Sequence, residues 1–190
     1  MPHAELLAPL PVARRTRTPQ PATPVLLALV AEIDAACGSS PGAMKDRIIA
    51  ALKAAVARPE LLTADQRVPQ CGCYARHVLH SDPAGCYSIV AIVWGAGQFS
   101  PPHAHHTWCA YAVHETPLEE TLYGWDGKNN AAQPVRTEIR EPGYGCYAHA
   151  GLDQIHRLGN SGTEPAISIH VYGVERERVA THVNRVVQVA

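Results

Sequence analysis

Three histidines, His103, His105 and His156, have the residue type and spacing of a metal site. His103 and His105 are two residues apart, so in an extended strand their side chains lie on the same face. Two imidazoles on one face can reach a single ion. His156 lies far enough along the chain to belong to another strand of the same sheet. We therefore predict that these three imidazoles bind one metal ion.

His106 follows the second of these histidines directly, and it competes with its neighbour for the role of ligand. Its strand parity is the opposite one, because successive side chains of a strand point to opposite faces. We expect His106 to lie outside the set of ligands.

A second polar constellation lies in the segment 167–172, where Ser168, His170 and Tyr172 alternate with Ile and Val. This period of two is typical of a strand with one face in the core. Taken alone, the segment could be an ordinary half-exposed strand. Beside a metal site, the other face predicts a row of hydroxyl, imidazole and phenol that borders a pocket.

The composition is that of an ordinary globular domain. The chain has 190 residues, 46% hydrophobic residues and a formal net charge of −1. There is no basic excess that would indicate nucleic-acid binding and no apolar run long enough to span a membrane. The arginines at 14, 15 and 17 do not precede an apolar core, as they would in a secretory signal. We predict a cytoplasmic protein with no nucleic-acid or membrane partner, and six cysteines that remain reduced thiols.

The chain divides into three parts by pattern. Residues 1–24 are rich in Pro, Arg and Thr and predict a loose arm. Apolar residues recur at three- and four-residue spacing over 25–37 and 44–57, which predicts two amphipathic helices within about 25–58.

After the helical part the period changes. Short segments alternate or run apolar between Gly, Pro and Asn, which predicts many short strands over about 70–190. We expect a mainly β fold, an antiparallel β-barrel or jelly roll with N-terminal helices, as one domain over 25–190.

The order of four motifs resembles the two signature motifs of the cupin superfamily: Gly97, His103-x-His105, Pro142-Gly143 and His156-x-x-x-Asn160. The general cupin pattern adds a glutamate ligand shortly after its second histidine, where this chain has Cys109 and Ala110. This departure leaves a site of three imidazoles without a carboxylate. The resemblance itself implies a cupin-type β-barrel.

A narrower resemblance is to the thiol dioxygenases, the family of cysteine dioxygenase and 3-mercaptopropionate dioxygenase, over roughly residues 74–172. It is carried by Tyr74-x-Arg76, Trp94-Gly-x-Gly97, His103-x-His105, Glu120-Thr-Leu122, His156-Arg157 with Asn160, and Glu164-Pro-Ala-x-Ser168-x-His170-x-Tyr172. In that family the three matching histidines bind ferrous iron, and the Ser-His-Tyr relay borders the substrate pocket.

The resemblance implies one Fe(II) per chain, held by His103, His105 and His156. It also implies that Tyr172, hydrogen-bonded through His170 to Ser168, positions substrate or oxygen and passes a proton. The reaction expected is the oxidation of a small thiol carboxylate by O2 to its sulfinate, with both oxygen atoms incorporated.

The donor set agrees with this chemistry without choosing the metal. Imidazole nitrogen suits iron, copper, nickel and zinc alike. A site without a carboxylate is one unit more positive than the usual non-haem iron site, and it favours an anionic ligand such as a thiolate.

Arg76 is the expected anchor for the substrate carboxylate, because a guanidinium fork binds a carboxylate bidentately. An arginine here resembles the cysteine-oxidising enzymes, whereas the surrounding residues resemble the bacterial mercaptopropionate branch. Cysteine, mercaptosuccinate and 3-mercaptopropionate all remain candidate substrates, and we favour a thiol acid other than cysteine. Tyr172 is the second expected substrate-binding residue.

Animal cysteine dioxygenases form a thioether between a cysteine and the tyrosine of the relay. Counted from the second ligand histidine, the matching position here is Ala110, and Cys109 is expected to face the opposite side of its strand. We therefore expect no crosslink to Tyr172.

Two other functions remain open. The chain could be a cupin enzyme that uses zinc, nickel or manganese for isomerisation or hydrolysis, since a three-histidine zinc site is well precedented. It could also be a non-catalytic sensor of a metal or small molecule, with the helical N-terminal part binding a partner. We expect a monomer or a weak homo-oligomer.

Overall fold

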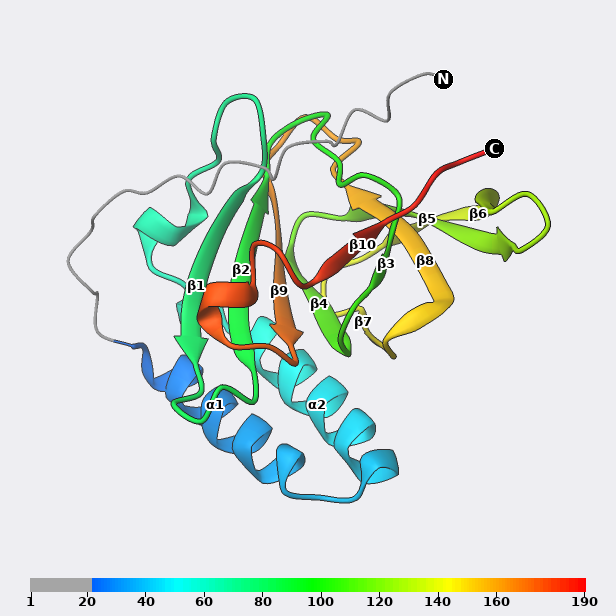
Figure 1. Cartoon of the computed structure of the whole chain (residues 1–190). Coiled ribbons are helices and arrows are strands. Elements are labelled where there is room, and N and C mark those ends of the chain that lie inside the picture. Colours follow the sequence, from blue (N-terminus) through cyan, green and yellow to red (C-terminus); the bar gives the residue numbers. More distant parts are fainter. Residues whose placement is uncertain (1–21) are drawn as a thin grey trace.

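The structure, a computed structural model, describes residues 22–190, which form two five-stranded antiparallel sheets preceded by two helices (Figure 1). The helices are α1 (Pro24–Cys37) and α2 (Pro41–Val56), followed by the short 3-10 turns η1 (Pro59–Leu61) and η2 (Ala64–Arg67). The strands of the first sheet are β1 (Ala75–Ser81), β2 (Ser88–Trp94), β9 (Ala166–Tyr172), β4 (Cys109–Glu115) and β7 (Gly145–Ala148), in that order. The strands of the second are β10 (Asn184–Val186), β3 (His103–His105), β8 (Gly151–Gly159), β5 (Leu118–Asp126) and β6 (Ala131–Arg140). A third turn, η3 (Arg176–Arg178), precedes β10.

Both helices begin at a proline. Pro24 and Pro41 occupy the first turn, where the missing N–H costs nothing because it would have no partner in the helix. The Thr23 hydroxyl caps α1 by accepting a hydrogen bond from the backbone N–H of Leu26 at 3.1 Å. The two helices predicted over 25–37 and 44–57 are confirmed, and each begins slightly earlier than predicted because of its N-terminal proline.

The helices cover the outer face of the first sheet. Their buried residues, among them Leu29, Ile33, Ile48 and Leu52, form one apolar cluster with alternate residues of β2 and β9. Ile167, Ile169 and Val171 belong to this cluster, so the apolar face of the predicted strand packs against the helices.

The opposite face of β9 points between the two sheets. Its polar residues Ser168 and His170 are buried, as is Tyr172, which belongs to the apolar cluster between the sheets. The alternation predicted for this strand is confirmed, and both of its faces are buried. A β-strand that is buried on both sides must satisfy its polar groups with partners inside the protein.

The architecture confirms the predicted fold class, a mainly β jelly roll of the cupin type with N-terminal helices. The two sheets face each other and are not closed into a single barrel. The predicted division into an arm over 1–24 and one domain over 25–190 stays a prediction, since residues 1–21 lie outside the described part. No helix within residues 22–190 is long and apolar enough to cross a membrane.

The end of β8 passes very close to the loop before β3. A Cβ atom added to Gly159 would lie 2.4 Å from the backbone oxygen of Gln98 and 2.4 Å from the ring of Phe99. Backbone at this distance cannot yield as a flexible side chain would, so glycine is required at this position.

Gly159→Ala should therefore lower the free energy of unfolding by about 1–3 kcal/mol, the usual cost of overpacking. Gly42→Ala is the matched control, because no atom lies within 4 Å of the added Cβ and the residue is helical. It should be neutral or slightly stabilising. Urea denaturation of both variants measures the difference, and equal stabilities would contradict the close packing described.

Candidate metal centre

His103, His105 and His156 converge from two neighbouring strands. β3 pairs with β8, with His103 opposite His156, and a register shift in this pairing brings His105 opposite Gly151. The ring centroids are 4.7–5.2 Å apart, and the candidate ligand atoms all lie within 4.8 Å of one another. All three residues are buried, so the structure brings together the three histidines predicted from their spacing.

His106, the neighbour that competes for the role of ligand, is exposed. Its backbone N–H donates a hydrogen bond to the carbonyl of Val183 at 2.9 Å. The parity argument that excluded it from the set of ligands agrees with this position.

Hydrogen bonds fix the orientation of two of the three imidazoles. His103 Nδ1 lies 2.8 Å from the carbonyl oxygen of Pro101, and His156 Nδ1 lies 2.7 Å from Oε1 of Glu120. Both oxygens accept, so each Nδ1 carries the proton and each Nε2 keeps a free lone pair. His105 Nδ1 is buried without a hydrogen-bond partner, which leaves a polar atom whose burial is not compensated.

Burial keeps two of these imidazoles, His103 and His105, neutral. It lowers the pKa of His103 well below its usual value, with a further contribution from the neighbouring His156. The same two causes lower the pKa of His105 to about 3. A cation binds only the deprotonated nitrogen of histidine, so these two residues have at neutral pH the protonation state that a divalent metal needs. The residues present therefore fit a three-imidazole metal site.

The predicted Ser-His-Tyr relay is only partly formed. Ser168 Oγ lies 2.8 Å from His170 Nε2, as predicted. Between His170 and Tyr172 the structure shows stacked rings, with centroids 5.5 Å apart, and no hydrogen bond joins them among the described residues. The expected second link of the relay is therefore wrong for this structure. The reason is that side chains two apart on one strand lie side by side, which favours stacking.

Trp94, which was not predicted to belong to the relay, extends it at the Ser168 end. The indole N–H of Trp94 on β2 donates a hydrogen bond to Ser168 Oγ at 2.9 Å. Trp94 lies opposite Ala166 in the β2–β9 pairing, two positions from Ser168. The sequence contains no local signal for this contact, because it depends on the register of two strands distant along the chain.

Arg76 lies beside the three histidines. It lines a cavity of about 10 Å³ together with Tyr74, Tyr172, Asn184 and the three imidazoles. Its guanidinium donates a hydrogen bond to the Tyr74 hydroxyl at 2.9 Å and lies 5.1 Å from the centroid of that ring. A cavity of this size holds about one water molecule, so a larger ligand has to displace side chains.

The position of Cys109 corrects the expectation about the face of the strand on which it lies. In the pairing of β4 with β9, Cys109 lies opposite Tyr172, whereas Ala110 lies opposite Val171. Cys109 belongs with Tyr172 to the cluster between the sheets, and Ala110 belongs to the cluster under the helices. The count from His105 was wrong because the loop between β3 and β4 interrupts the alternation of a single strand.

A second cavity, of about 280 Å³, lies on the other side of the histidines. His105 and His156 line both cavities, and the larger one also includes Cys109, Glu120 and Arg140. The three-histidine cluster therefore forms part of the wall between the two spaces.

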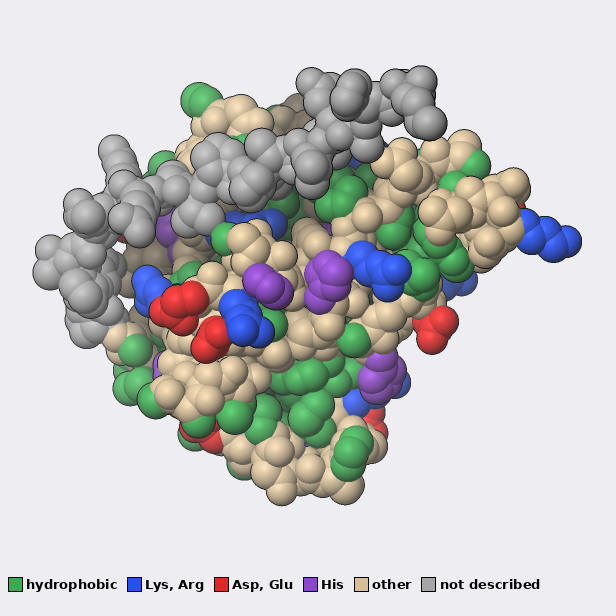
Figure 2. All heavy atoms as spheres, in the orientation of Figure 1, with side chains coloured by type: hydrophobic (Ala, Val, Ile, Leu, Met, Phe, Trp, Pro, Cys, Tyr) green, Lys and Arg blue, Asp and Glu red, His purple; other side chains and the backbone are tan. Residues whose placement is uncertain are grey.

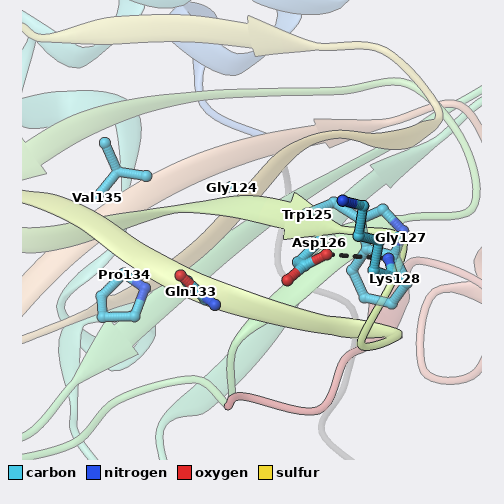
Figure 3. Close-up of a pocket in the computed structure, with 8 residues that line it drawn as sticks. All are labelled: Gly124, Trp125, Asp126, Gly127, Lys128, Gln133, Pro134 and Val135. Atoms are coloured by element: carbon cyan, nitrogen blue, oxygen red, sulfur yellow. Dashed lines mark hydrogen bonds between the residues drawn. The ribbon is translucent and has the colours of Figure 1, made fainter.

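A larger hollow, about 740 Å³, lies away from the histidines at the turn end of the β5–β6 hairpin (Figure 3). It is lined by Trp125, Lys128, Val135 and the adjoining turn. The carboxylate of Asp126 closes this turn by accepting a hydrogen bond from the backbone N–H of Lys128 at 2.9 Å. The residues around it do not converge on a common point, and size alone does not make it a reactive site.

A model of the family described as cysteine dioxygenase type I matches residues 71–182, more than half of the chain. The matched part contains all three candidate ligands, Arg76 and the Ser-His-Tyr segment. The chain belongs to this family.

Relatives with curated names agree with this assignment. The chain is 31% identical over 91 residues to cysteine dioxygenase type 1 of Homo sapiens, a match that covers 46% of this chain and 45% of that protein. It is 28% identical over 103 residues to the enzyme of the same name from Danio rerio, covering 52% of this chain and 50% of that protein. The chain thus spans about half the length of the curated relatives it matches.

A solved structure of an uncharacterized conserved protein with a double-stranded β-helix domain from Klebsiella pneumoniae is also similar. The similarity covers 63% of this chain and 88% of that chain, with 21% identity and a TM-score of 0.46.

Proposed function

We propose that this protein is an Fe(II)-dependent thiol dioxygenase that uses O2 to oxidise a small thiol carboxylate to its sulfinate. The observation that carries the proposal is the set of three buried imidazoles without a carboxylate among them, facing a cavity that contains one arginine. Family membership supports the reaction class. The iron, one per chain, would supply the site at which the thiol and O2 react.

The residues around the cavity have different roles in binding the metal and the substrate. His103, His105 and His156 hold the metal, and Arg76 binds the substrate carboxylate. Burial, together with the nearby Cys109, raises the pKa of Tyr172 well above its usual value, so its hydroxyl stays protonated and can donate a hydrogen bond.

Ser168 and His170 orient the Tyr172 phenol at the wall of the cavity. The hydroxyl of Ser168 is held by the N–H of Trp94, and it in turn holds His170 Nε2. Burial lowers the pKa of His170 well below its usual value, so this imidazole stays neutral beside Tyr172. A fixed, neutral ring in this place orients the phenol by stacking.

The charges in the small cavity support a substrate other than cysteine. Its lining contains Arg76 and no Asp or Glu, so a substrate ammonium group finds no carboxylate partner there. A thiol acid without an ammonium, such as mercaptosuccinate or 3-mercaptopropionate, leaves no such charge unpaired. Asn184, on the C-terminal strand β10, is a polar lining residue that we had not identified from the sequence.

Other partners remain predictions. On the part of the surface that Figure 2 shows and the structure describes, acidic and basic side chains are interspersed. The expected absence of a nucleic-acid partner stays a prediction. The cytoplasmic location and the monomeric or weakly oligomeric state stay predictions.

The metal assignment is tested with alanine variants. His103→Ala, His105→Ala and His156→Ala should each abolish iron binding and thiol-dependent oxygen uptake, because each removes one of only three protein ligands. His106→Ala, an exposed neighbour, should keep most of the iron. The measurement is metal content after anaerobic loading with Fe(II). Equal loss of iron in His106→Ala would show that the wrong histidine has been chosen.

The same measurement separates the other functions. A protein that retains zinc, nickel or manganese in preference to iron, and consumes no oxygen with any thiol, would be a cupin of another reaction class. Metal binding without turnover of any thiol would favour a sensor.

The substrate anchor is tested with Arg76→Gln. Loss of a charged bidentate contact in a desolvated pocket costs about 2–5 kcal/mol, so kcat/KM for the preferred thiol should fall by roughly 30-fold or more. Preference should shift toward 3-mercaptopropionate. Arg58→Gln, at an exposed position outside the cavity, is the control and should keep full activity. Oxygen consumption across a panel of thiol carboxylates measures both, and an unchanged preferred thiol with full activity in Arg76→Gln would exclude the anchor.

The pairing of Cys109 with Tyr172 leads to a covalent prediction. Directly opposite residues of antiparallel strands have Cβ atoms about 4.5–5.5 Å apart, so the thiol can reach the phenol ring. With iron, thiol and O2 present, a bond between Cys109 Sγ and a ring carbon of Tyr172 should form, with O2 taking the two hydrogens removed.

Intact mass after turnover should then fall by the mass of two hydrogens, and peptide mapping should join the two residues. Cys109→Ser should keep the full mass of its sequence, whereas Cys146→Ser, which removes a half-buried thiol nearby, should still show the loss. An unchanged mass in the wild-type protein after turnover would sink this prediction.

A further inference from the structure

Glu120 is a buried carboxylate directly behind one of the candidate ligands. It lies on β5, which pairs with β8 so that Leu122 is opposite His156 and Glu120 is two positions away on the same face. Its side chain is 3% exposed, and Oε1 lies 2.7 Å from His156 Nδ1. This contact is on the side of the imidazole that faces away from the other two histidines, because Nε2 is the free ligand atom.

The second oxygen of this carboxylate has its own partner. Oε2 of Glu120 accepts a hydrogen bond from Nε of Arg140 on β6 at 2.7 Å. Arg140 also pairs with Glu138, and its guanidinium lies 4.3 Å from the centroid of the Tyr144 ring. The carboxylate is thus held from both sides, by an imidazole N–H and by a guanidinium.

Charge distinguishes Glu120 from the partner of the other oriented ligand. His103 donates its Nδ1 hydrogen to the neutral carbonyl of Pro101, whereas His156 donates its hydrogen to a carboxylate. The Glu120 carboxylate accepts hydrogen bonds from both the His156 imidazole and the Arg140 guanidinium, and a cation at 2.7 Å favours the ionised form of a buried carboxyl group. A carboxylate behind a ligating histidine fixes its tautomer and raises the basicity of the nitrogen that binds the metal.

The three ligands themselves bring no negative charge to the metal. In a buried site a divalent cation gains from any carboxylate nearby, since the interaction between charges is weakly screened there. Within residues 22–190, the only group of at least three candidate ligands that converge to metal-binding distance is the set of three histidines, which contains no acid. Glu120 is the acid in hydrogen-bond contact with that set.

We propose that Glu120 is a positioning residue that supplies to the metal centre, through His156, the negative charge that its three imidazole ligands lack. The proposal rests on the metal centre of the proposed function. It assigns a role to a residue of the Glu120-Thr-Leu122 motif that has none in the proposed reaction.

The first test measures the affinity of the metal-free protein for Zn²⁺ by competition with a chelator, which requires neither iron nor turnover. Glu120→Gln keeps an oxygen that can accept from His156 Nδ1 and removes the charge. Its affinity should be about 10- to 100-fold weaker, the usual effect of losing such a partner. Glu138→Gln is the matched control: it removes the other carboxylate of Arg140 without touching His156, and its affinity should stay within about threefold of wild type.

Arg140→Gln separates this role from that of a structural ion pair. It removes the cation that shares the charge of Glu120 but leaves the contact of Glu120 with His156. If Glu120 acts on the metal, the Zn²⁺ affinity of Arg140→Gln should be equal to or higher than that of wild type. If the pair only stabilises the fold, Arg140→Gln and Glu120→Gln should weaken binding alike, which would overturn the proposal.

The reduction potential of the iron-loaded protein gives a readout that a structural role would not move in this pattern. A nearby carboxylate stabilises the more positive ferric state, so Glu120→Gln should raise the potential, Arg140→Gln should lower it and Glu138→Gln should leave it nearest to wild type. If Glu120→Gln does not fold, as judged by circular dichroism, the opposite shift in Arg140→Gln still decides the matter. Shifts of the same sign in both variants would overturn the proposal.

His156→Ala distinguishes the failure of this proposal from failure of the metal centre. Loss of Zn²⁺ binding in His156→Ala together with wild-type affinity in Glu120→Gln would reject the role of Glu120 alone. Wild-type affinity in His156→Ala would reject the three-histidine centre itself.

Discussion

The pairing of β3 with β8 is the constraint on which the site depends. It brings the candidate ligand atoms of three buried imidazoles within 4.8 Å of one another in the space between two sheets. Three polar rings in such a place cost free energy unless their nitrogens are used. The hydrogen bonds to Pro101 and Glu120 use two of them on the outer side, and the remaining lone pairs converge where a cation would be bound.

Two chains of hydrogen bonds connect buried polar groups near this centre. One joins His156 through Glu120 to Arg140, and the other joins His170 through Ser168 to Trp94. Each chain of hydrogen bonds includes strands that are distant along the sequence. Such hydrogen bonds fix the orientation of the buried rings that make them.

The two cavities on either side of the histidines suit different tasks. The small one combines a single arginine with the phenol of Tyr172, and it contains no carboxylate. The larger one is lined by the carboxylates of Glu120 and Asp153, the thiols of Cys109 and Cys146, and the guanidinium groups of Arg136 and Arg140. The separation keeps the carboxylate out of the space in which the substrate carboxylate is expected to bind, and two like charges in one small cavity would repel each other.

Local patterns in the sequence determined the helices over 24–37 and 41–56, the two faces of β9, the shared face of His103 and His105, and the exclusion of His106. Each of these follows from a period of 3.6 or 2 within one element. Tertiary structure alone decided that Cys109 lies opposite Tyr172, that Trp94 holds Ser168, and that Glu120 stands behind His156. These contacts join different strands, and their register is set by loops and bulges between the elements. A one-residue slip in a loop reverses the face of every strand residue that follows it. Counting residues along the chain therefore cannot predict which side chains lie opposite one another in the sheet.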